Sequence, residues 1–287
     1  MNRRIIELYD KYTHGGLDRR SFLGGLARLA GSAAAAAALL PLLENRYAEA
    51  ATVAPDDPAL KTGREAIDAP GGAVACYVAR PAGRPKRRPA VVLIHENRGL
   101  NAHIEDVARR LAVAGFLAIA PDALSVSGGT PKDEDLARKR IGELDSEATL
   151  RIYLAAVRHA VKYRHSTGKV GCVGFCWGGG MAGRLAANSP ELAAAVVFYG
   201  MPPAADEAAR VHVPLLLNYA GLDTRINDAV PAFEQTLKTA GVRYELHMYE
   251  GVDHAFHNDT NAARYNAAAA ALAWKRTVEF LTRELGK

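Results

Sequence analysis

The sequence predicts a single α/β domain with a mainly parallel sheet and helices on both of its faces. Several runs are apolar throughout, such as 90–96 (AVVLIHE) and 116–122 (FLAIAPD), which is typical of strands buried on both faces. These runs alternate with stretches of helical periodicity, the pattern of parallel strands joined by helices. A length of 287 residues with 49% hydrophobic and 23% charged residues fits one globular domain with a large core.

The expected elements follow one another from residue 64. The first two strands flank "APGGA" and suggest a hairpin. Strands and helices then alternate, and the final helix carries an apolar stripe from Ala267 to Leu285 at steps of three and four residues. The expected strands are 64–69, 73–80, 90–96, 116–122, 169–174, 194–199, 214–220 and 243–249, and the expected helices are 104–115, about 145–164, the run after Cys176, 228–240 and 267–285.

The chain is expected to divide into three parts. Residues 1–50 form an N-terminal extension, residues 51–63 form a linker rich in Pro and Asp, and residues 64–287 form the α/β domain. The charged tract at 130–145 is most simply a solvated loop and helix, and a lid over the site is the alternative.

The extension resembles a twin-arginine export signal. Residues 19–23 (RRSFL) precede an Ala-rich stretch, and 48–50 (AEA) offer a cleavage site. Export, which we favour, would bring the folded protein to the periplasm. Arg28 inside the apolar region and Glu44 near its end suggest instead an amphipathic helix that stays attached and packs on the domain of a cytoplasmic protein. The apolar run 33–43 is too short to span a bilayer, so no stable membrane span is expected.

Charge and cysteine content exclude some classes of function. The net charge of +5 is small, so no nucleic-acid surface is predicted. Three cysteines cannot form a disulfide framework, and Cys76 and Cys172 fall in strand-like runs where buried cysteine is usually inert packing. Cys172 and Cys176 are spaced C-x3-C, which is neither a zinc-finger spacing nor a C-x-x-C redox pair. The sequence does not indicate an oligomeric state.

The third cysteine is a candidate nucleophile. An apolar strand stops at Gly174, a Gly-x-Cys-x-Gly-Gly turn follows, and a helical run of small residues begins directly after Cys176. Such a turn projects a side chain into a cleft, while the free N–H groups and the dipole of the helix favour negative charge. The backbone N–H groups of Trp177 and of Asn97, in the loop after strand 90–96, are expected to face the oxyanion of a tetrahedral intermediate.

An acid and an imidazole follow two later strands. Asp223 comes after strand 214–220 and His254 after strand 243–249, and ligands of such sheets bind beyond the carboxyl ends of the strands. The order nucleophile, acid, histidine is that of α/β hydrolases. His254 can exchange a proton near neutral pH, and Asp223 can hold the ring in the required tautomer.

Each of these polar residues also has a simpler interpretation. Asp223 could cap the next helix, although Asp228 is better placed to do so. His257 competes with His254, and "HAFH" could be read as metal ligands, but no carboxylates or thiols cluster around that loop to complete a site. No metal is therefore predicted. For His95, at a strand end, a structural hydrogen bond is the default.

Four segments together resemble the dienelactone hydrolase family of α/β hydrolases, over about residues 64–285. They are "HENRGLNAHIEDVARRLAVAGFLAIAPD", "GKVGCVGFCWGGG", "AGLDTRIN" and "GVDHAFHND". The resemblance implies an α/β-hydrolase fold that needs no cofactor. It also implies cleavage of a small carboxylic ester or lactone through an acyl-enzyme on Cys176.

The resemblance gives Glu96 a role as well. In the family the corresponding acid contacts the thiol and takes its proton when substrate binds, whereas the simpler alternative is an ion pair of Glu96 with Arg98 or Arg225. Enzymes that act on dienelactone bind the substrate carboxylate with arginines, one of them four residues after the catalytic histidine, where this chain has Asn258. Arg98 and Arg225 could substitute. Ester or lactone cleavage is therefore predicted, and dienelactone itself is not.

Two rival functions remain open on the sequence. The same turn supports other reactions, such as cleavage of a thioester or a carbon–halogen bond, or acyl transfer. A thiol module that senses oxidants or binds a ligand covalently is the rival from another class. Asp223 and His254 favour turnover, because a sensor needs a reactive thiol but no base oriented by an acid.

Overall fold

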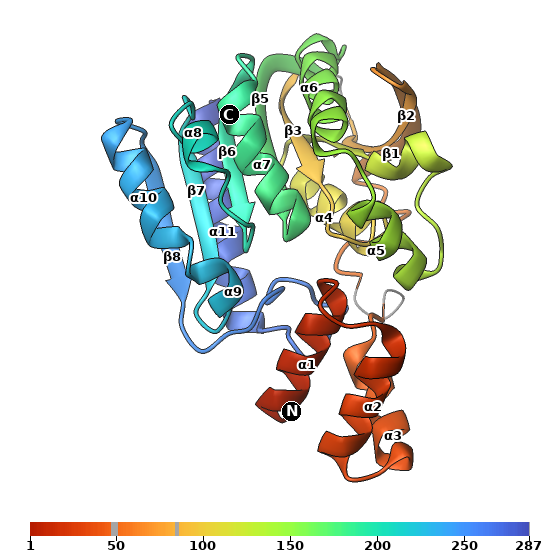
Figure 1. The fold of residues 1–287 in the computed structure, drawn as a ribbon. Helices are drawn as coiled ribbons and strands as arrows, with labels where there is room; N and C mark the ends of the chain where they lie inside the picture. Colours follow the sequence, from red (N-terminus) through yellow and green to blue (C-terminus); the bar gives the residue numbers. More distant parts are fainter. Residues whose placement is uncertain (47–50, 84–85, 287) are drawn as a thin grey trace.

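The computed structural model describes residues 1–46, 51–83 and 86–286 and is built around an eight-stranded sheet with strand order β1-β2-β4-β3-β5-β6-β7-β8 (Figure 1). β1 pairs antiparallel with β2, β2 pairs antiparallel with β4, and the remaining neighbours are parallel. The mainly parallel sheet that the sequence predicts is therefore confirmed. The strands are β1 (Leu60–Ala69), β2 (Gly72–Pro81), β3 (Arg88–Ile94), β4 (Leu117–Pro121), β5 (Ser166–Phe175), β6 (Leu192–Phe198), β7 (Leu215–Ala220) and β8 (Tyr244–Tyr249).

Two hydrophobic cores lie on the two faces of this sheet. Along β3, Val92 and Ile94 point into a core that includes Leu150 of α6 and Leu185 of α7, while Val91 lies in the core formed with α4 and α11. This alternation follows from the two-residue period of a strand, and it explains why strands covered on both faces are apolar throughout. The helices of the domain are α4 (Ala102–Val113), α5 (Glu134–Gly142), α6 (Ser146–Lys162), α7 (Trp177–Asn188), α8 (Ala205–Ala208), α9 (Thr224–Asn227), α10 (Val230–Thr239) and α11 (Ala267–Leu285), with a 3₁₀ turn η1 (Ala123–Ser127).

Polar residues mark the starts of the longer helices. The side chains of Asn101, Asp145 and Asn266 accept hydrogen bonds from backbone N–H groups in the first turns of α4, α6 and α11, respectively. Each such cap satisfies a donor that the helix itself leaves free, a contribution of about 1 kcal/mol. The same rule fails at α10, because Asp228 ends α9 and Ala229 stands at the N-terminus of α10. The expectation that Asp228 caps this helix is therefore wrong.

Several boundaries differ by a few residues from those that the sequence predicts, among them the start of β1 and the end of β3. β1 begins at Leu60 instead of residue 64, because Leu60 to Gly63 extend the ladder with β2, where Gly63 pairs with Val78. The end of the expected linker is thus part of the sheet. β3 ends at Ile94, so His95 and Glu96 lie in the loop beyond the strand. This shift places both side chains at the rim where the parallel strands end.

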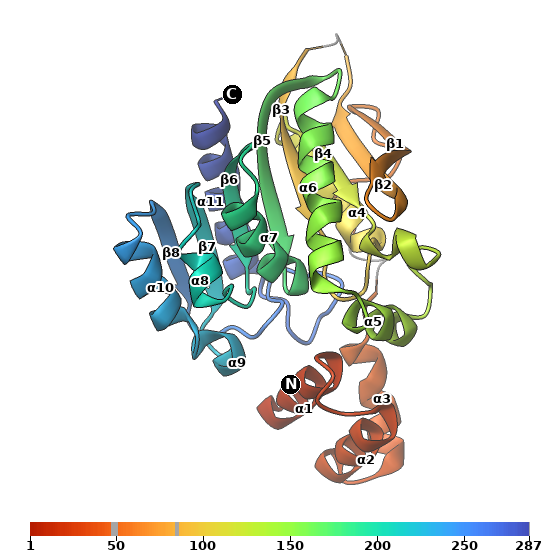
Figure 2. The ribbon, with the colours of Figure 1, turned by 45° about the horizontal axis from the view of Figure 1, so that its top comes forward.

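The extension forms three helices, α1 (Arg3–Thr13), α2 (Arg19–Ala30) and α3 (Ala33–Leu43). They enclose a small core of their own, in which the rings of Tyr12 and Phe22 stack with centroids 4.4 Å apart. Figure 2 shows the three helices together below the ends of the strands, against the loop that follows β8. The cleavage site expected at 48–50 lies outside the described residues.

Hydrogen bonds and ion pairs join this extension to the domain. The amide of Asn261 donates to the carbonyl of Leu43 (2.6 Å), and Arg264 lies 3.2 Å from Asp10. Arg19, the first arginine of the expected export signal, pairs with Asp135 of α5 at 2.8 Å. Among the described helices none is by itself long and apolar enough to cross a membrane; α2 and α3 reach that composition together, but the chain bends by 112° between them.

Candidate active site

Cys176 stands on a sharp turn between β5 and α7. Its φ of 54° lies in a region that side-chain-bearing residues rarely adopt, and its ψ is −116°. Glycines make this turn possible, because a Cβ at Gly174 would collide with the carbonyl of Gly178, and a Cβ at Gly178 would collide with the carbonyl of His95. The turn therefore presents the thiol at the rim with helix α7 starting directly behind it. Cys176 itself is 8% exposed.

His254 and Asp223 meet at this thiol. Nδ1 of His254 donates to Oδ2 of Asp223 at 2.5 Å, and both side chains are buried. Because Nδ1 is bound in this way, Nε2 is the ring nitrogen that faces the thiol, and no group other than this thiol is a partner for it among the described residues. The structure thus brings together the three residues that the sequence places at the ends of three different strands.

A second imidazole, which sequence reasoning missed, also reaches the thiol. His14 follows α1, and its Nε2 lies 3.5 Å from Sγ of Cys176. Its ring meets the ring of His254 edge-on, with centroids 4.6 Å apart. No local pattern pairs His14 with Cys176, 162 residues away. Only the docking of the extension brings them together.

Opposite charges shift the titration of this cluster. Burial by itself would raise the pKa of the Cys176 thiol, but the positive charge of His254, the hydrogen bond of His14 and the charge of His14 lower that pKa to about 5. Burial would lower the pKa of His254, yet the negative charges of Cys176 and Asp223 raise it to about 10. Between these values Cys176 and His254 form a thiolate–imidazolium pair, a state in which the sulfur is nucleophilic.

Glu96 lies beside this pair, buried and 3% exposed. Its Oε2 accepts a hydrogen bond from Nδ2 of Asn258 at 2.7 Å, while its Oε1 lies within hydrogen-bonding distance of no polar group among the described residues. Glu96 forms no ion pair with any described residue. The alternative considered from the sequence, an ion pair of Glu96 with Arg98 or Arg225, is therefore not seen among the described residues. Glu96 lines the same small cavity as Cys176 and His254.

The two backbone positions expected to bind an oxyanion flank the thiol. Trp177 is the first residue of α7, where the N–H has no partner within the helix. Asn97 lies in the loop after β3, and both residues line one pocket together with Cys176. The side chain of Asn97 is turned to the extension, where its Nδ2 donates to the carbonyl of Thr13 at 2.8 Å.

The two arginines expected to bind substrate have different positions. Nε of Arg98 donates to Glu134 at 2.7 Å and its NH2 donates to the hydroxyl of Tyr9, so Arg98 holds the extension and does not line the main pocket. Arg98 does line a small cavity that it shares with Cys176, Glu96 and His254, so its assignment to substrate binding stays a prediction. Arg225 lines the main pocket, and its NH2 lies 3.5 Å from Nδ1 of His254. No carboxylate pairs with Arg225 within the part of the chain that the structure describes.

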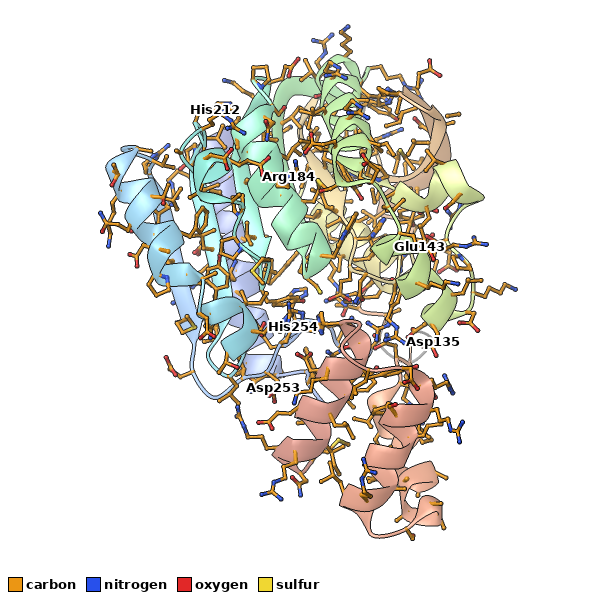
Figure 3. The ribbon with its side chains drawn as sticks, viewed as in Figure 1. Asp135, Glu143, Arg184, His212, Asp253 and His254 are labelled. Atoms are coloured by element: carbon orange, nitrogen blue, oxygen red, sulfur yellow. The ribbon has the colours of Figure 1, made fainter. Side chains whose placement is uncertain are left out.

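The main pocket has a volume of about 590 Å³ and apolar walls around the thiol. Trp177 and Met181 of α7, Met201 and Ile226 line it, and α5 contributes Arg138 and other residues to the lining. The charged tract at 130–145 thus forms part of the pocket wall. A second pocket lies on the other side of α1, against Asp10 and Asp223. Figure 3 shows His254 at the junction of the strand ends and α1.

The other sequence candidates have structural roles. Nδ1 of His95 donates to the carbonyl of Glu96, and its Nε2 accepts from the N–H of Ala123, as expected for a structural histidine. His257 packs among aromatic rings, including Phe175, and burial keeps its pKa well below the usual range. Cys76 and Cys172 are buried in strands, and burial raises the pKa of each thiol.

A strand–turn–helix with its residue of positive φ at the carboxyl edge of a mainly parallel sheet defines an α/β hydrolase. A sequence model of the Dienelactone hydrolase family matches residues 74–285, and the chain belongs to that family. A second model, described as YqhI-like, matches residues 1–33.

Relatives and solved structures agree with this family. A protein of Escherichia coli O157:H7 named "Putative carboxymethylenebutenolidase" is 32% identical over 248 residues, which are 81% of this chain and 90% of that protein. A crystal structure titled "Putative Dienelactone Hydrolase", from Klebsiella pneumoniae, is 29% identical with a TM-score of 0.72 and covers 78% of this chain and 99% of its own. The dienelactone hydrolase-like promiscuous phosphotriesterase P91, from metagenomic libraries, has the same fold at 24% identity and a TM-score of 0.72, over 79% of this chain and all of its own.

Proposed function

We propose that the protein cleaves small carboxylic esters or lactones with Cys176 as nucleophile, His254 as proton carrier and Asp223 as the group that orients His254. One observation carries this proposal: the Nδ1 of His254 is held by Asp223 at 2.5 Å, so that its Nε2 faces a thiol on a positive-φ turn. This arrangement suits acyl transfer, because it supplies an activated nucleophile and a proton donor at one point.

In the first half of the reaction the Cys176 thiolate attacks the carbonyl carbon of the substrate. A carbon–sulfur bond forms, and the carbonyl electrons move onto the oxygen, which the N–H groups of Trp177 and Asn97 stabilise. Collapse of this intermediate breaks the bond to the leaving alkoxide, which takes the proton from Nε2 of the His254 imidazolium. The product alcohol leaves, or in a lactone stays attached, and a thioester on Cys176 remains.

Water completes the cycle. Neutral His254 takes a proton from water, the hydroxide attacks the thioester carbonyl, and the carbon–sulfur bond breaks to give back the thiolate. His254 is again protonated, and the carboxylic acid leaves and loses its own proton to solvent. These steps use only water and groups of this chain, so no cofactor is required.

The pocket supports a small substrate with an apolar body. Its volume of about 590 Å³ and its lining by Trp177, Met181 and Met201 suit a short acyl group. Arg225, without an acidic partner among the described residues, suits a carboxylate elsewhere on the substrate. Asn258 contacts Glu96 and not the pocket, which supports a substrate other than dienelactone.

Glu96 is proposed to take the proton of the thiol when Cys176 is protonated. Two observations support this role: Oε1 of Glu96 has no hydrogen-bond donor within reach among the described residues, and Glu96 shares a cavity with Cys176. Asn258 holds the other carboxylate oxygen and so leaves Oε1 available.

The extension is proposed to stay attached to the mature protein. Its contacts with the domain support this, because removal of the segment would take Asp10 from Arg264 and the carbonyl of Leu43 from the amide of Asn261, and would expose to solvent the domain surface on which the extension packs. The test is the intact mass of the purified protein. A mass that begins near residue 1 supports retention, and a mass that begins near residue 51 refutes it.

The test of the function is hydrolysis of short-chain p-nitrophenyl esters by the wild type and by Cys176→Ala, with intact mass recorded during turnover. We expect repeated turnover with an acyl adduct on the wild type, and no turnover by the variant. Cys76→Ala is the matched control, because Cys76 is an equally buried thiol of β2 that does not line the pocket. A single adduct without turnover would indicate a thiol sensor instead.

A further inference from the structure

The cluster at the thiol has the composition of a metal site. Sγ of Cys176 and one ring nitrogen each of His14 and His254 lie within 4.8 Å of one another. A thiolate with two imidazoles is a donor set that zinc-like transition ions prefer, whereas Mg²⁺ and Ca²⁺ require oxygen ligands. In the sequence, His254 and His257 are the only pair that suggests metal ligands. In the structure His257 instead packs among aromatic rings, including that of Phe175.

The second contacts of both histidines fit such a site. Nδ1 of His14 donates to the carbonyl of Asp10 at 2.8 Å, and Nδ1 of His254 donates to Asp223. Metal-bound histidines usually donate their other ring nitrogen to a carbonyl or carboxylate, which fixes the tautomer and aims the lone pair at the metal. Here both Nε2 atoms are left for the centre of the cluster, and Nε2 of His254 is buried with no partner outside the cluster in the described part of the chain.

The distances also fit a tetrahedral ion. Bond lengths of about 2.3 Å to sulfur and about 2.0 Å to nitrogen give sulfur–nitrogen edges of about 3.5 Å. Nε2 of His14 lies 3.5 Å from Sγ, so this edge is already formed. The longest of the three distances between the donor atoms would have to shorten by about 1 Å to match this geometry. The three residues line the main pocket, which leaves the fourth position open to water.

We propose that Cys176, His14 and His254 bind a zinc-type divalent cation in a three-ligand site that exists only while the extension is docked. The ion takes the sulfur lone pair and both Nε2 lone pairs. When it enters the thiolate–imidazolium pair, the proton on Nε2 of His254 goes to solvent. Because the bound sulfur is no longer a free nucleophile, the ion inhibits the ester hydrolysis; this last step alone rests on the function proposed above.

The probe is Co²⁺, because a cobalt–thiolate bond gives a charge-transfer band in the near ultraviolet. Titration of the full chain is expected to saturate at one Co²⁺ per chain with this band, and Zn²⁺ is expected to displace the cobalt. Cys176→Ser should lose the band. His14→Asn should weaken the affinity by at least about 100-fold. His212→Asn is the matched control, because His212 is an exposed histidine away from His254 (Figure 3) and should leave the affinity unchanged.

Absence of the band in the wild type would overturn the proposal, and so would equal affinities of the wild type and His14→Asn. Inhibition is measured separately, as ester hydrolysis with Zn²⁺ and after removal of the metal with EDTA. If cobalt binds but the metal-free protein cleaves no ester, the proposed function fails while the metal site stands. If the protein cleaves esters but shows no band, the function stands and the metal site fails.

Discussion

Replacing His254 by Gln tests the electrostatic account of the thiol directly. The side chain lies 4% exposed at the centre of the cluster, and its charge is the main force that opposes burial of the Cys176 thiolate. Without the imidazolium, burial acts against the thiolate with only His14 to offset it. We therefore expect the pKa of Cys176 to rise, and alkylation of Cys176 to begin at a higher pH in the variant.

The expected size follows from the pKa values. The wild-type pKa of Cys176 is lowered to about 5, whereas an ordinary thiol titrates at about 8.5. At about 1.4 kcal/mol for each pH unit, this difference corresponds to about 5 kcal/mol of interaction with the thiolate. His14 remains in the variant and still supplies part of this interaction with the thiolate. The pH midpoint of Cys176 alkylation should therefore rise by at least about 2 units.

The midpoint is a better measurement than the rate at one pH. A thiolate of low pKa is intrinsically less nucleophilic, with a Brønsted slope of about 0.4–0.5, which offsets much of its larger population. Iodoacetamide alkylation followed by intact mass from pH 4 to 9 gives the midpoint. Cys76 and Cys172 should not be alkylated in this pH range, because both are buried and burial raises the pKa of each thiol. His212→Gln is the control; a midpoint for His254→Gln within about half a unit of the wild type would refute the reasoning.

Three further substitutions test the remaining roles. Asp223→Asn should lower kcat for ester hydrolysis by roughly 10²- to 10⁴-fold, because an amide would donate to Nδ1 and turn the ring to the wrong tautomer; an unchanged kcat would remove Asp223 from the mechanism. Arg225→Gln should raise KM about 10-fold or more for esters that carry a carboxylate and leave neutral esters of equal size unchanged, and equal effects on both would contradict a charge-binding role. Glu96→Gln, which keeps an acceptor for Asn258, should slow acylation most below the pKa of the thiol, where Cys176 is protonated; a uniform loss across the pH profile would indicate a structural role.

The sharp turn at Cys176 could be predicted from the sequence because its determinants are local. Gly174 and Gly178 are required where backbone carbonyls approach closely, and a cysteine between them at a strand-to-helix junction leaves few alternatives. Asp223 and His254 could be predicted because parallel strands end at one edge of the sheet, so residues far apart in the chain meet there. In each case the information lies in the residues themselves or in the topology.

His14 and Arg98 could not be predicted because their roles depend on tertiary docking. The sequence allows an extension that is removed, in which case Tyr9 would not bind Arg98. In the structure Tyr9 and Glu134 bind Arg98, and the end of α1 carries His14 to the thiol. Nothing in the spacing of these residues reveals such contacts, since they depend on how one helical unit packs on another.

The docking of the extension on the domain is therefore expected to depend on a small number of buried contacts. Asp10→Ala tests one of them, the ion pair of Asp10 with Arg264. Arg264 is 4% exposed, its NH1 lies 3.2 Å from Asp10, and its guanidinium lies over the ring of Tyr9. Removing one partner of a buried pair leaves an uncompensated charge, and because Asp10 is partly exposed we expect about 1–3 kcal/mol of lost docking free energy.

Limited proteolysis with trypsin measures this docking, because the extension carries several arginines and trypsin cleaves a helix only after it has unfolded locally, which undocking favours. Asp10→Ala should be cleaved within residues 1–46 faster than the wild type, while the α/β domain stays intact. Glu7→Ala is the matched control on the same helix, since it removes only the exposed pair with Arg3, which contributes little. Equal cleavage rates for the two variants would mean that Asp10 and Arg264 do not hold α1, and that His14 is kept at the thiol by the apolar contacts of the extension instead.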